Sequence, residues 1–304
     1  MRRHAMRPDL DPAVRLFQDA RPRLWGLAYR MLGSRADADD AVQDTWMKWQ
    51  AADRADIEAP NAWLTAVCSR HCVDMLRAAH RTRVDYVGPW LPEPIIDDGT
   101  PGPAEGAELA SSLSMAFLVL LERLSPPERA AYLLREVFDY DYADISHILE
   151  KSPDACRQMV SRARRHLTKG GTQPGTTDRR GTASDTDRRN QLLDGFLDAL
   201  KSGDAHPIEA LLAEDAALWA DGGGKAAAAL NVIHGASKIA RFLAGVWNKN
   251  GFGLTIDRTV VNGDPGLLFR EAGEITTVVS FAVGDDGQIA GVFIVRNPDK
   301  LSAV

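Results

Sequence analysis

The sequence predicts a multidomain protein in which two all-α domains precede a C-terminal α+β domain. Up to residue 167 apolar residues recur at helical spacing, whereas strand-like runs separated by turn signals follow residue 251. Stretches rich in Pro and Gly (85–107) and in Gly, Thr, Asp and Arg (169–187) divide the chain into three blocks. A chain of 304 residues with 45% hydrophobic content can form two or three folded domains.

The first block, residues 12–84, is expected to be helical. Its first apolar stripe ends at Gly33-Ser34, a pair that predicts the end of one helix and the start of the next. The second helix lies in an acidic segment between Asp37 and Glu58, which favours a basic protein partner. Asn61 is expected to cap a third helix.

The second block, residues 108–168, is expected to end in a helix-turn-helix. The segment Ser125–Glu128 has the pattern of a capping box, and Tyr140–Leu167 has the pattern of two helices joined by a tight turn. Ser152 is the expected N-cap of the last helix. The turn carries Glu150-Lys151 where Gly is common, so one of the two must adopt a less favourable backbone conformation.

The last helix of this block has a buried stripe and a basic outer face. Five side chains face outward together: Arg157, Gln158, Ser161, Arg162 and Arg165. Arginine and glutamine can read guanine and adenine edges in the major groove, and arginine also binds phosphate. The face therefore predicts DNA binding; the alternative is a solvated helix with scattered charge. Because the net charge is −6, any DNA affinity must come from such local surfaces.

Residues 12–167 resemble an extracytoplasmic-function (ECF) sigma factor. The motifs that carry this are Asp37–Thr45, Ala62–Leu64, the Arg70…Asp74…Leu76-Arg77 spacing and the helix-turn-helix. The resemblance implies that 12–84 is sigma region 2 and that 108–168 is sigma region 4, joined by a linker at 85–107.

The resemblance also implies roles for individual residues. Asp40, Gln43 and Asp44 would dock on the clamp helices of the β′ subunit of core RNA polymerase. The −10 element of promoter DNA would be bound and opened by Asn61, Trp63, Arg70, Arg77 and Arg81, and the −35 element would be read by the outer face of the last helix. The chain departs from the family at His71, where Asn is usual.

The third block, residues 188–304, resembles the cone-shaped SnoaL-like α+β fold. This rests on the helix at 190–200, the Asp215…Trp219 segment and Ile233–Phe242. A subgroup of sigma factors with such a domain carries three sequence marks, which are intact here as Trp90–Pro94, Asp221–Lys225 and Asn297–Leu301. The resemblance implies that the domain contacts the sigma core and regulates it in cis. The residues of these marks assigned to that contact are Trp90, Pro92, Asp221, Gly222, Gly223, Gly224, Lys225, Asn297, Pro298, Asp299 and Lys300.

The SnoaL-like fold also hosts enzymes, so an alternative is an enzyme or ligand sensor fused to a helix-turn-helix repressor. The candidate pocket groups for that alternative are Trp219, Asp221, His234, Arg270 and Glu274, but no nucleophile–base spacing stands out. We therefore expect no catalytic residues and no cofactor, although an unknown small ligand in the cone stays open.

Cysteine usage and hydropathy predict a protein of the cytoplasm. Cys68, Cys72 and Cys156 lack a zinc spacing, so no metal site is expected. No apolar run reaches membrane-spanning length, and the N-terminus lacks the apolar segment of a secretion signal. Nothing suggests a dedicated dimerisation helix, so we expect a monomer when the protein is free.

Overall fold

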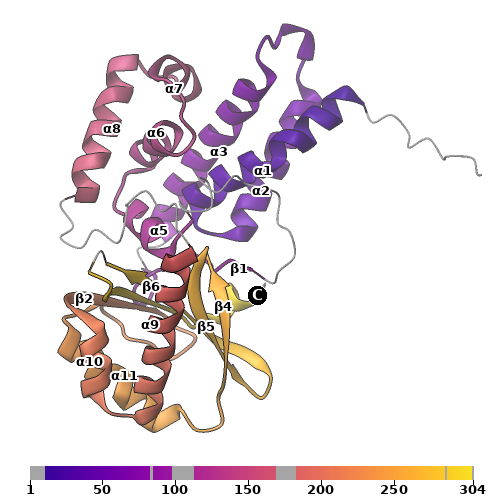
Figure 1. The fold of residues 1–304 in the computed structure, drawn as a ribbon. Helices are drawn as coiled ribbons and strands as arrows, with labels where there is room; N and C mark the ends of the chain where they lie inside the picture. Colours follow the sequence, from indigo (N-terminus) through magenta and orange to yellow (C-terminus); the bar gives the residue numbers. More distant parts are fainter. Residues whose placement is uncertain (1–10, 83–84, 98–112, 169–182, 285, 303–304) are drawn as a thin grey trace, which may run out of the picture.

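The computed structural model describes residues 11–82, 85–97, 113–168, 183–284 and 286–302. Two helical domains lie side by side, and the C-terminal domain packs beneath them (Figure 1). The first helical domain contains α1 (Pro12–Leu32), α2 (Arg35–Ala51), a short 3-10 helix (Arg54–Asp56) and α3 (Pro60–Thr82). Gly33 ends α1 in the left-handed conformation and Ser34 caps α2, as the sequence predicts. The expected cap at Asn61 is wrong: α3 begins at Pro60, a residue suited to a first helical position, so Asn61 lies within the first turn.

The described part of the second helical domain consists of α5 (Met115–Leu121), α6 (Pro126–Glu136), α7 (Tyr142–Leu149) and α8 (Pro153–Thr168). The predicted capping box at Ser125 and Glu128 is present. Ser152 caps α8 by accepting from the amide of Ala155 at 3.2 Å. The strained turn residue is Glu150, with φ 53° and ψ 47°. The helix-turn-helix prediction is therefore confirmed.

The two helical domains share one hydrophobic core. Buried side chains of α1 and α3 pack in the same cluster as those of α6, α7 and α8. Polar contacts cross the boundary: the hydroxyls of Thr65 and Tyr140 lie 2.9 Å apart, and Arg129 donates to the carbonyl of Met31 at 2.6 Å. Arg23 likewise donates to the carbonyl of Phe138 at 3.0 Å. The boundary between the domains is thus a packed interface crossed by side-chain hydrogen bonds.

The C-terminal domain begins with helices and continues into strands. Its elements are α9 (Ala183–Ser202), α10 (Ala205–Leu211), β2 (Leu212–Asp221), β3 (Ile233–His234), α11 (Ala236–Asn250), β4 (Thr255–Val261), β5 (Asp264–Glu271), β6 (Glu274–Val283), β7 (Ile289–Val295) and α12 (Pro298–Leu301). The predicted α+β class is confirmed. Val261 pairs with Asp264, so Asn262-Gly263 forms a two-residue turn with φ 53° and 80°.

The sheet takes its edge strand from the linker. Its order is β1-β4-β5-β6-β7-β2-β3, and β1 (Ile96–Asp97) lies between the two helical domains in the sequence. Ile96 pairs with Val261 and Asp97 with Val260, antiparallel. The linker, rich in Pro and Gly, thus contributes Ile96–Asp97 as a strand to the sheet of the C-terminal domain.

The central part of the sheet is buried on both faces. On one face, α9, α10 and α11 cover side chains such as Leu218, Leu267 and Val292. On the other, Phe293 and its neighbours pack against the linker residue Leu91, against Met115 of α5 and against α12. Burial on both sides explains why every residue of β7 is buried. Within the described ranges, no helix combines the length and apolar character required to span a membrane.

Candidate functional site

The basic face of α8 is exposed as predicted. Arg157, Gln158, Ser161, Arg162 and Arg165 line one shallow concavity of the surface. On the opposite side of α8, Cys156, Val160 and Ala163 are buried in the helical core. The helix therefore presents a connected row of hydrogen-bond donors of the kind that contacts DNA grooves and phosphates.

Two arginines of this face have carboxylate partners. Arg157 Nη1 lies 2.5 Å from Asp154 Oδ1, one turn earlier on the same helix. Arg162 Nε donates to Glu128 Oε1 of α6 at 2.8 Å. Burial opposes ionisation of Glu128, but hydrogen bonds from Ser125 and Arg162 outweigh it and lower the pKa of this carboxyl below its ordinary value. The sequence pattern predicted the exposed face of α8, but it did not predict that Asp154 and Glu128 pair with its arginines.

The residues expected to handle the −10 element lie along α3. Asn61 is exposed in the first turn, and Trp63 is half-buried, with its ring 5.6 Å from that of Trp49. Arg70 Nη1 contacts Glu150 Oε1, in the turn of the helix-turn-helix, at 2.5 Å. Arg77 pairs with Asp74 on α3 at 3.1 Å. The side chain of Arg81 lies outside the described residues.

The residues expected to dock on polymerase lie on α2. Asp40 and Gln43 are exposed, and Asp44 is half-exposed. Asp44 Oδ2 lies 3.1 Å from His71 Nε2 of α3, the position at which the chain departs from the sigma pattern. The three side chains share the side of α2 opposite its buried residues Ala38, Ala41 and Val42, so they are available to a partner.

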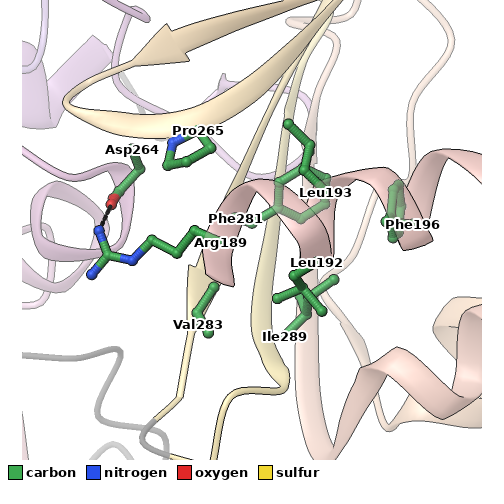
Figure 2. A pocket seen from close by; sticks show the side chains of 9 residues that line it. All are labelled: Arg189, Leu192, Leu193, Phe196, Asp264, Pro265, Phe281, Val283 and Ile289. Atoms are coloured by element: carbon green, nitrogen blue, oxygen red, sulfur yellow. Dashed lines mark hydrogen bonds and ion pairs between the residues drawn. The ribbon is translucent and has the colours of Figure 1, made fainter. Parts of the chain in front are cut away.

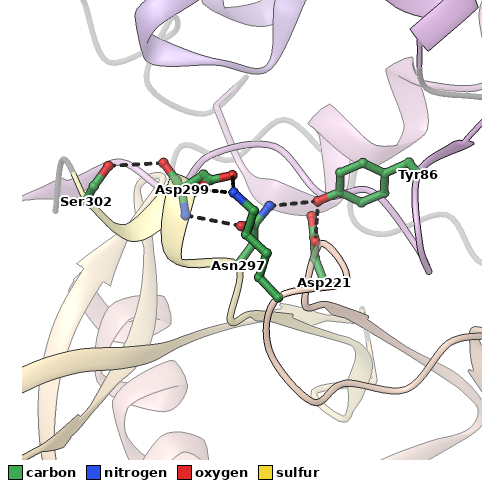
Figure 3. Close-up of polar contacts among 6 residues, drawn as sticks. Tyr86, Asp221, Asn297, Asp299 and Ser302 are labelled. Atoms are coloured by element: carbon green, nitrogen blue, oxygen red, sulfur yellow. Dashed lines mark hydrogen bonds and ion pairs between the residues drawn. The ribbon is translucent and has the colours of Figure 1, made fainter.

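A buried polar network joins the linker to the C-terminal domain (Figure 3). Asp221, at the end of β2, is 0% exposed and receives three donors. The Tyr86 hydroxyl donates to its Oδ1 at 2.6 Å, the Leu91 amide to its Oδ2 at 2.8 Å, and Lys300 Nζ to its Oδ2 at 2.7 Å. Burial, followed by the contact with Asp221, raises the pKa of Tyr86 well above its usual range, so this hydroxyl stays a donor.

The same network reaches the predicted marks at the tail and in the linker. Lys300 Nζ also donates to the carbonyl of Leu91 and lies 4.1 Å from the ring centroid of Trp90. Asn297 caps α12, whose first residue is Pro298, and its amide donates to the Tyr86 hydroxyl at 3.0 Å. These contacts bring sequence segments near residues 90, 221 and 297 to one place.

Close packing surrounds this network on the linker and on the glycine loop. Trp90 and Pro92 lie against Gly33, where an added Cβ would meet the Trp90 ring at 2.5 Å. Gly222, Gly223 and Gly224 follow Asp221, and Gly224 (φ +71°) lies against Val87 of the linker. Lys225 was expected to pair across domains, but its partner is Asp299 of the same domain, at 2.5 Å.

Sequence reasoning missed a second bridge, formed by Asn262 and Tyr29. The Asn262 side chain accepts from the Ile95 amide at 3.1 Å and donates to the Tyr29 hydroxyl at 2.8 Å. That hydroxyl donates to the carbonyl of Glu93 at 2.6 Å, and Glu93 Oε2 accepts from the Arg35 amide at 2.7 Å. The Asn-Gly turn was the only signal, and it predicts a hairpin and not a contact with α1.

The groups considered for an enzymatic pocket do not converge. Trp219 stacks on Phe293 on the linker-facing side of the sheet, 4.9 Å between centroids. Arg270 pairs with Asp257 at 2.7 Å on the exposed strands, and His234 and Glu274 are exposed. The hollow between α9 and the sheet is lined mainly by apolar residues, with Arg189 and Asp264 3.5 Å apart at its rim, and contains none of these groups (Figure 2). Among the described residues, no cluster of His, Cys, Asp and Glu suits a metal ion.

Comparison with known proteins identifies the helical domains. Residues 16–82 match the family model for sigma-70 region 2, and residues 114–167 match that for sigma-70 region 4. The chain is 33% identical to the ECF RNA polymerase sigma factor SigJ of Mycobacterium tuberculosis over 300 residues, covering 94% of this chain and 92% of SigJ. It is 26% identical to the probable ECF sigma factor SigI of the same species, covering 96% and 95%.

A solved structure extends the likeness to all three domains. The crystal structure of SigJ from M. tuberculosis superposes with a TM-score of 0.73 at 28% identity, covering 95% of this chain and 98% of that one. The helix-turn-helix, the sigma region matches and the SnoaL-like C-terminal domain thus agree along the chain, and it belongs to the ECF RNA polymerase sigma factors.

Proposed function

We propose that this sigma factor engages core RNA polymerase and promoter DNA through three separate surfaces. The exposed side of α2 at Asp40, Gln43 and Asp44 docks on the β′ clamp helices. The exposed residues of α3 bind the −10 element, and the basic face of α8 reads the −35 element. The geometry of α8 supports this, because its exposed donors form a continuous face of the kind that enters a major groove.

The C-terminal domain regulates the sigma core in cis by holding the linker between regions 2 and 4. The observation that carries this is the burial of Asp221 against Tyr86 and Leu91 of the linker. The added strand β1 and the Asn262–Tyr29 bridge attach the same linker at a second point. A linker fixed in this way limits how far the two helical domains can separate.

The chain acts by binding, and the polymerase supplies the chemistry. The relatives are sigma factors, and the interior of the C-terminal domain is packed with apolar side chains. We place the protein in the cytoplasm, as a monomer when it is free. The linker, α5 and α12 support the monomer, because they cover a sheet face that would otherwise be open to a second copy. A small ligand in the cone would have to enter beside Arg189 and Asp264.

Copurification of the full chain with core RNA polymerase, followed by run-off transcription on genomic fragments, tests the proposal. Asp40→Lys should weaken association, because it reverses a charge on the docking surface. Asp19→Lys is the matched control, since Asp19 is an exposed acidic residue of α1 outside that surface. Equal loss in both variants, or no association of the unaltered chain, would overturn the assignment.

Point variants test the regulatory role better than removal of the domain. Deleting the C-terminal domain would expose Leu91 and Met115, both buried against its sheet, so lost activity could reflect unfolding. Asn262→Gly should release the linker at one point and leave the sheet intact, because glycine keeps the positive φ of the turn. We expect its transcription rate to differ from that of the unaltered chain; identical rates at equal polymerase occupancy would contradict regulation through the linker.

A further inference from the structure

Glu128 performs two functions with its two carboxylate oxygens. Oε2 accepts from the amide and hydroxyl of Ser125, at 3.3 and 2.7 Å, and so completes the capping box of α6. Oε1 accepts from Nε of Arg162, on the neighbouring helix α8 (Figure 1). The side chain of Glu128 is only 10% exposed, whereas that of Arg162 is 45% exposed. The carboxylate is therefore a fixed point, and the guanidinium extends from it to the surface.

The site of attachment on Arg162 leaves its terminal nitrogens available. Glu128 holds Nε, and a guanidinium has four further N–H donors on its two Nη atoms. Arg162 also lines the same concavity as Gln158 and Arg165. A planar guanidinium with donors on both Nη atoms matches the O6 and N7 acceptors of guanine in the major groove.

We propose that Glu128 is a positioning residue that orients Arg162 to read a guanine of the −35 element. This inference rests on the proposed function and deepens it, because it assigns one base contact and the group that prepares it. Preorganisation lowers the rotamer entropy that a long side chain loses on binding. The effect of Glu128 on DNA is therefore indirect and passes through Arg162.

A second ion pair between the same two helices provides a matched control. Glu136 Oε1 accepts from Arg164 Nη2 at 2.8 Å, the same separation as in the Glu128–Arg162 pair. Arg164 does not line the concavity. Glu136→Gln thus weakens an ion pair between α6 and α8 without touching the proposed base reader.

The test is run-off transcription by the full chain with core polymerase from a library with a randomised −35 element, read by sequencing. Arg162→Ala should flatten the preference for guanine at one position by roughly 5- to 150-fold, the discrimination of a bidentate arginine–guanine contact. Glu128→Gln should reduce the preference at that same position by roughly 3- to 10-fold, since glutamine has one acceptor oxygen for the three donors of Ser125 and Arg162. Glu136→Gln should keep the unaltered pattern.

The double variant separates positioning from a structural role. In the Arg162→Ala background, Glu128→Gln should cause no further change at any position. The proposal is overturned if Glu128→Gln lowers output equally at all positions, if it leaves the guanine preference intact, or if Arg162→Ala weakens all sequences alike, as a phosphate contact would. Transcription by the unaltered chain reports on the proposed function separately from this position-specific pattern.

Discussion

Substitution of Asp221 by Asn tests the attachment of the linker most directly. The variant keeps the shape of the side chain but removes the carboxylate 2.7 Å from Lys300, whose side chain is 8% exposed. Removing one partner of a buried ion pair costs about 3–5 kcal/mol. An asparagine also has one acceptor oxygen for the donors of Tyr86 and Leu91, so a further contact is lost.

Native-state hydrogen exchange of the Leu91 amide measures this loss where it occurs. That amide donates to Asp221, so it exchanges only when the linker leaves the C-terminal domain. A decrease of about 3–5 kcal/mol in opening free energy corresponds to exchange that is faster by roughly 160- to 5,000-fold.

Two further variants control for charge and for context. Lys225→Met breaks the exposed pair with Asp299, and this should cost less than about 1 kcal/mol. Combining Asp221→Asn with Lys300→Met should cost at least about 1 kcal/mol less than the sum of the two single changes, since the two charges share one buried site. An exchange rate within threefold of the unaltered chain, or additivity of the single changes, would refute this account of the network.

Three other predictions follow from contacts described above. Asn262→Gly should speed exchange at the Ile95 amide and leave the Leu91 amide protected, because it keeps the turn and removes the side chain that forms the second point of linker attachment; equal acceleration at both sites would contradict two attachment points. Glu150 pairs with Arg70, so its replacement is made in an Arg70→Ala background, in which that ion pair is already absent. There, Glu150→Gly should raise the free energy of unfolding in urea by about 0.5–1 kcal/mol, since glycine adopts positive φ without strain. A free energy of unfolding below that of Arg70→Ala alone would show that the Glu150 side chain stabilises the fold beyond its ion pair. The lowered pKa of Glu128 means that its stabilisation is complete above the ordinary glutamate pKa and is lost as pH falls through its lower folded-state value. Urea unfolding at a series of pH values should therefore show that acidification lowers the free energy of unfolding less in Glu128→Gln than in the unaltered chain. The charged or titratable side chains that face Glu128 are Arg162 and His166.

Local patterns predicted the elements whose contacts lie close in sequence. The turn at Glu150, the cap at Ser152 and the basic face of α8 depend on spacings of a few residues, and all three are present. The resemblance to sigma factors supplied the functional surfaces on α2 and α3, whose roles stay predictions.

Contacts between distant segments could not be derived in the same way. Tyr29 and Asn262 are 233 positions apart, and Tyr86 and Asp221 are 135 apart, so no periodicity relates them. One signal was available: the uninterrupted apolar strand Ile289–Val295 indicates a sheet covered on both faces. It predicts that something packs on the second face, but not that the linker does so.

Under the proposed function, the shared core of the two helical domains sets an energetic threshold for binding both promoter elements. Elements named −10 and −35 lie about 25 base pairs apart, which is on the order of 85 Å of duplex at 3.4 Å per step. Helices joined by a hydroxyl contact of 2.9 Å between Thr65 and Tyr140 cannot occupy both elements at once. For both elements to be bound at once, polymerase and DNA must together supply the free energy needed to separate the buried side chains of this interface.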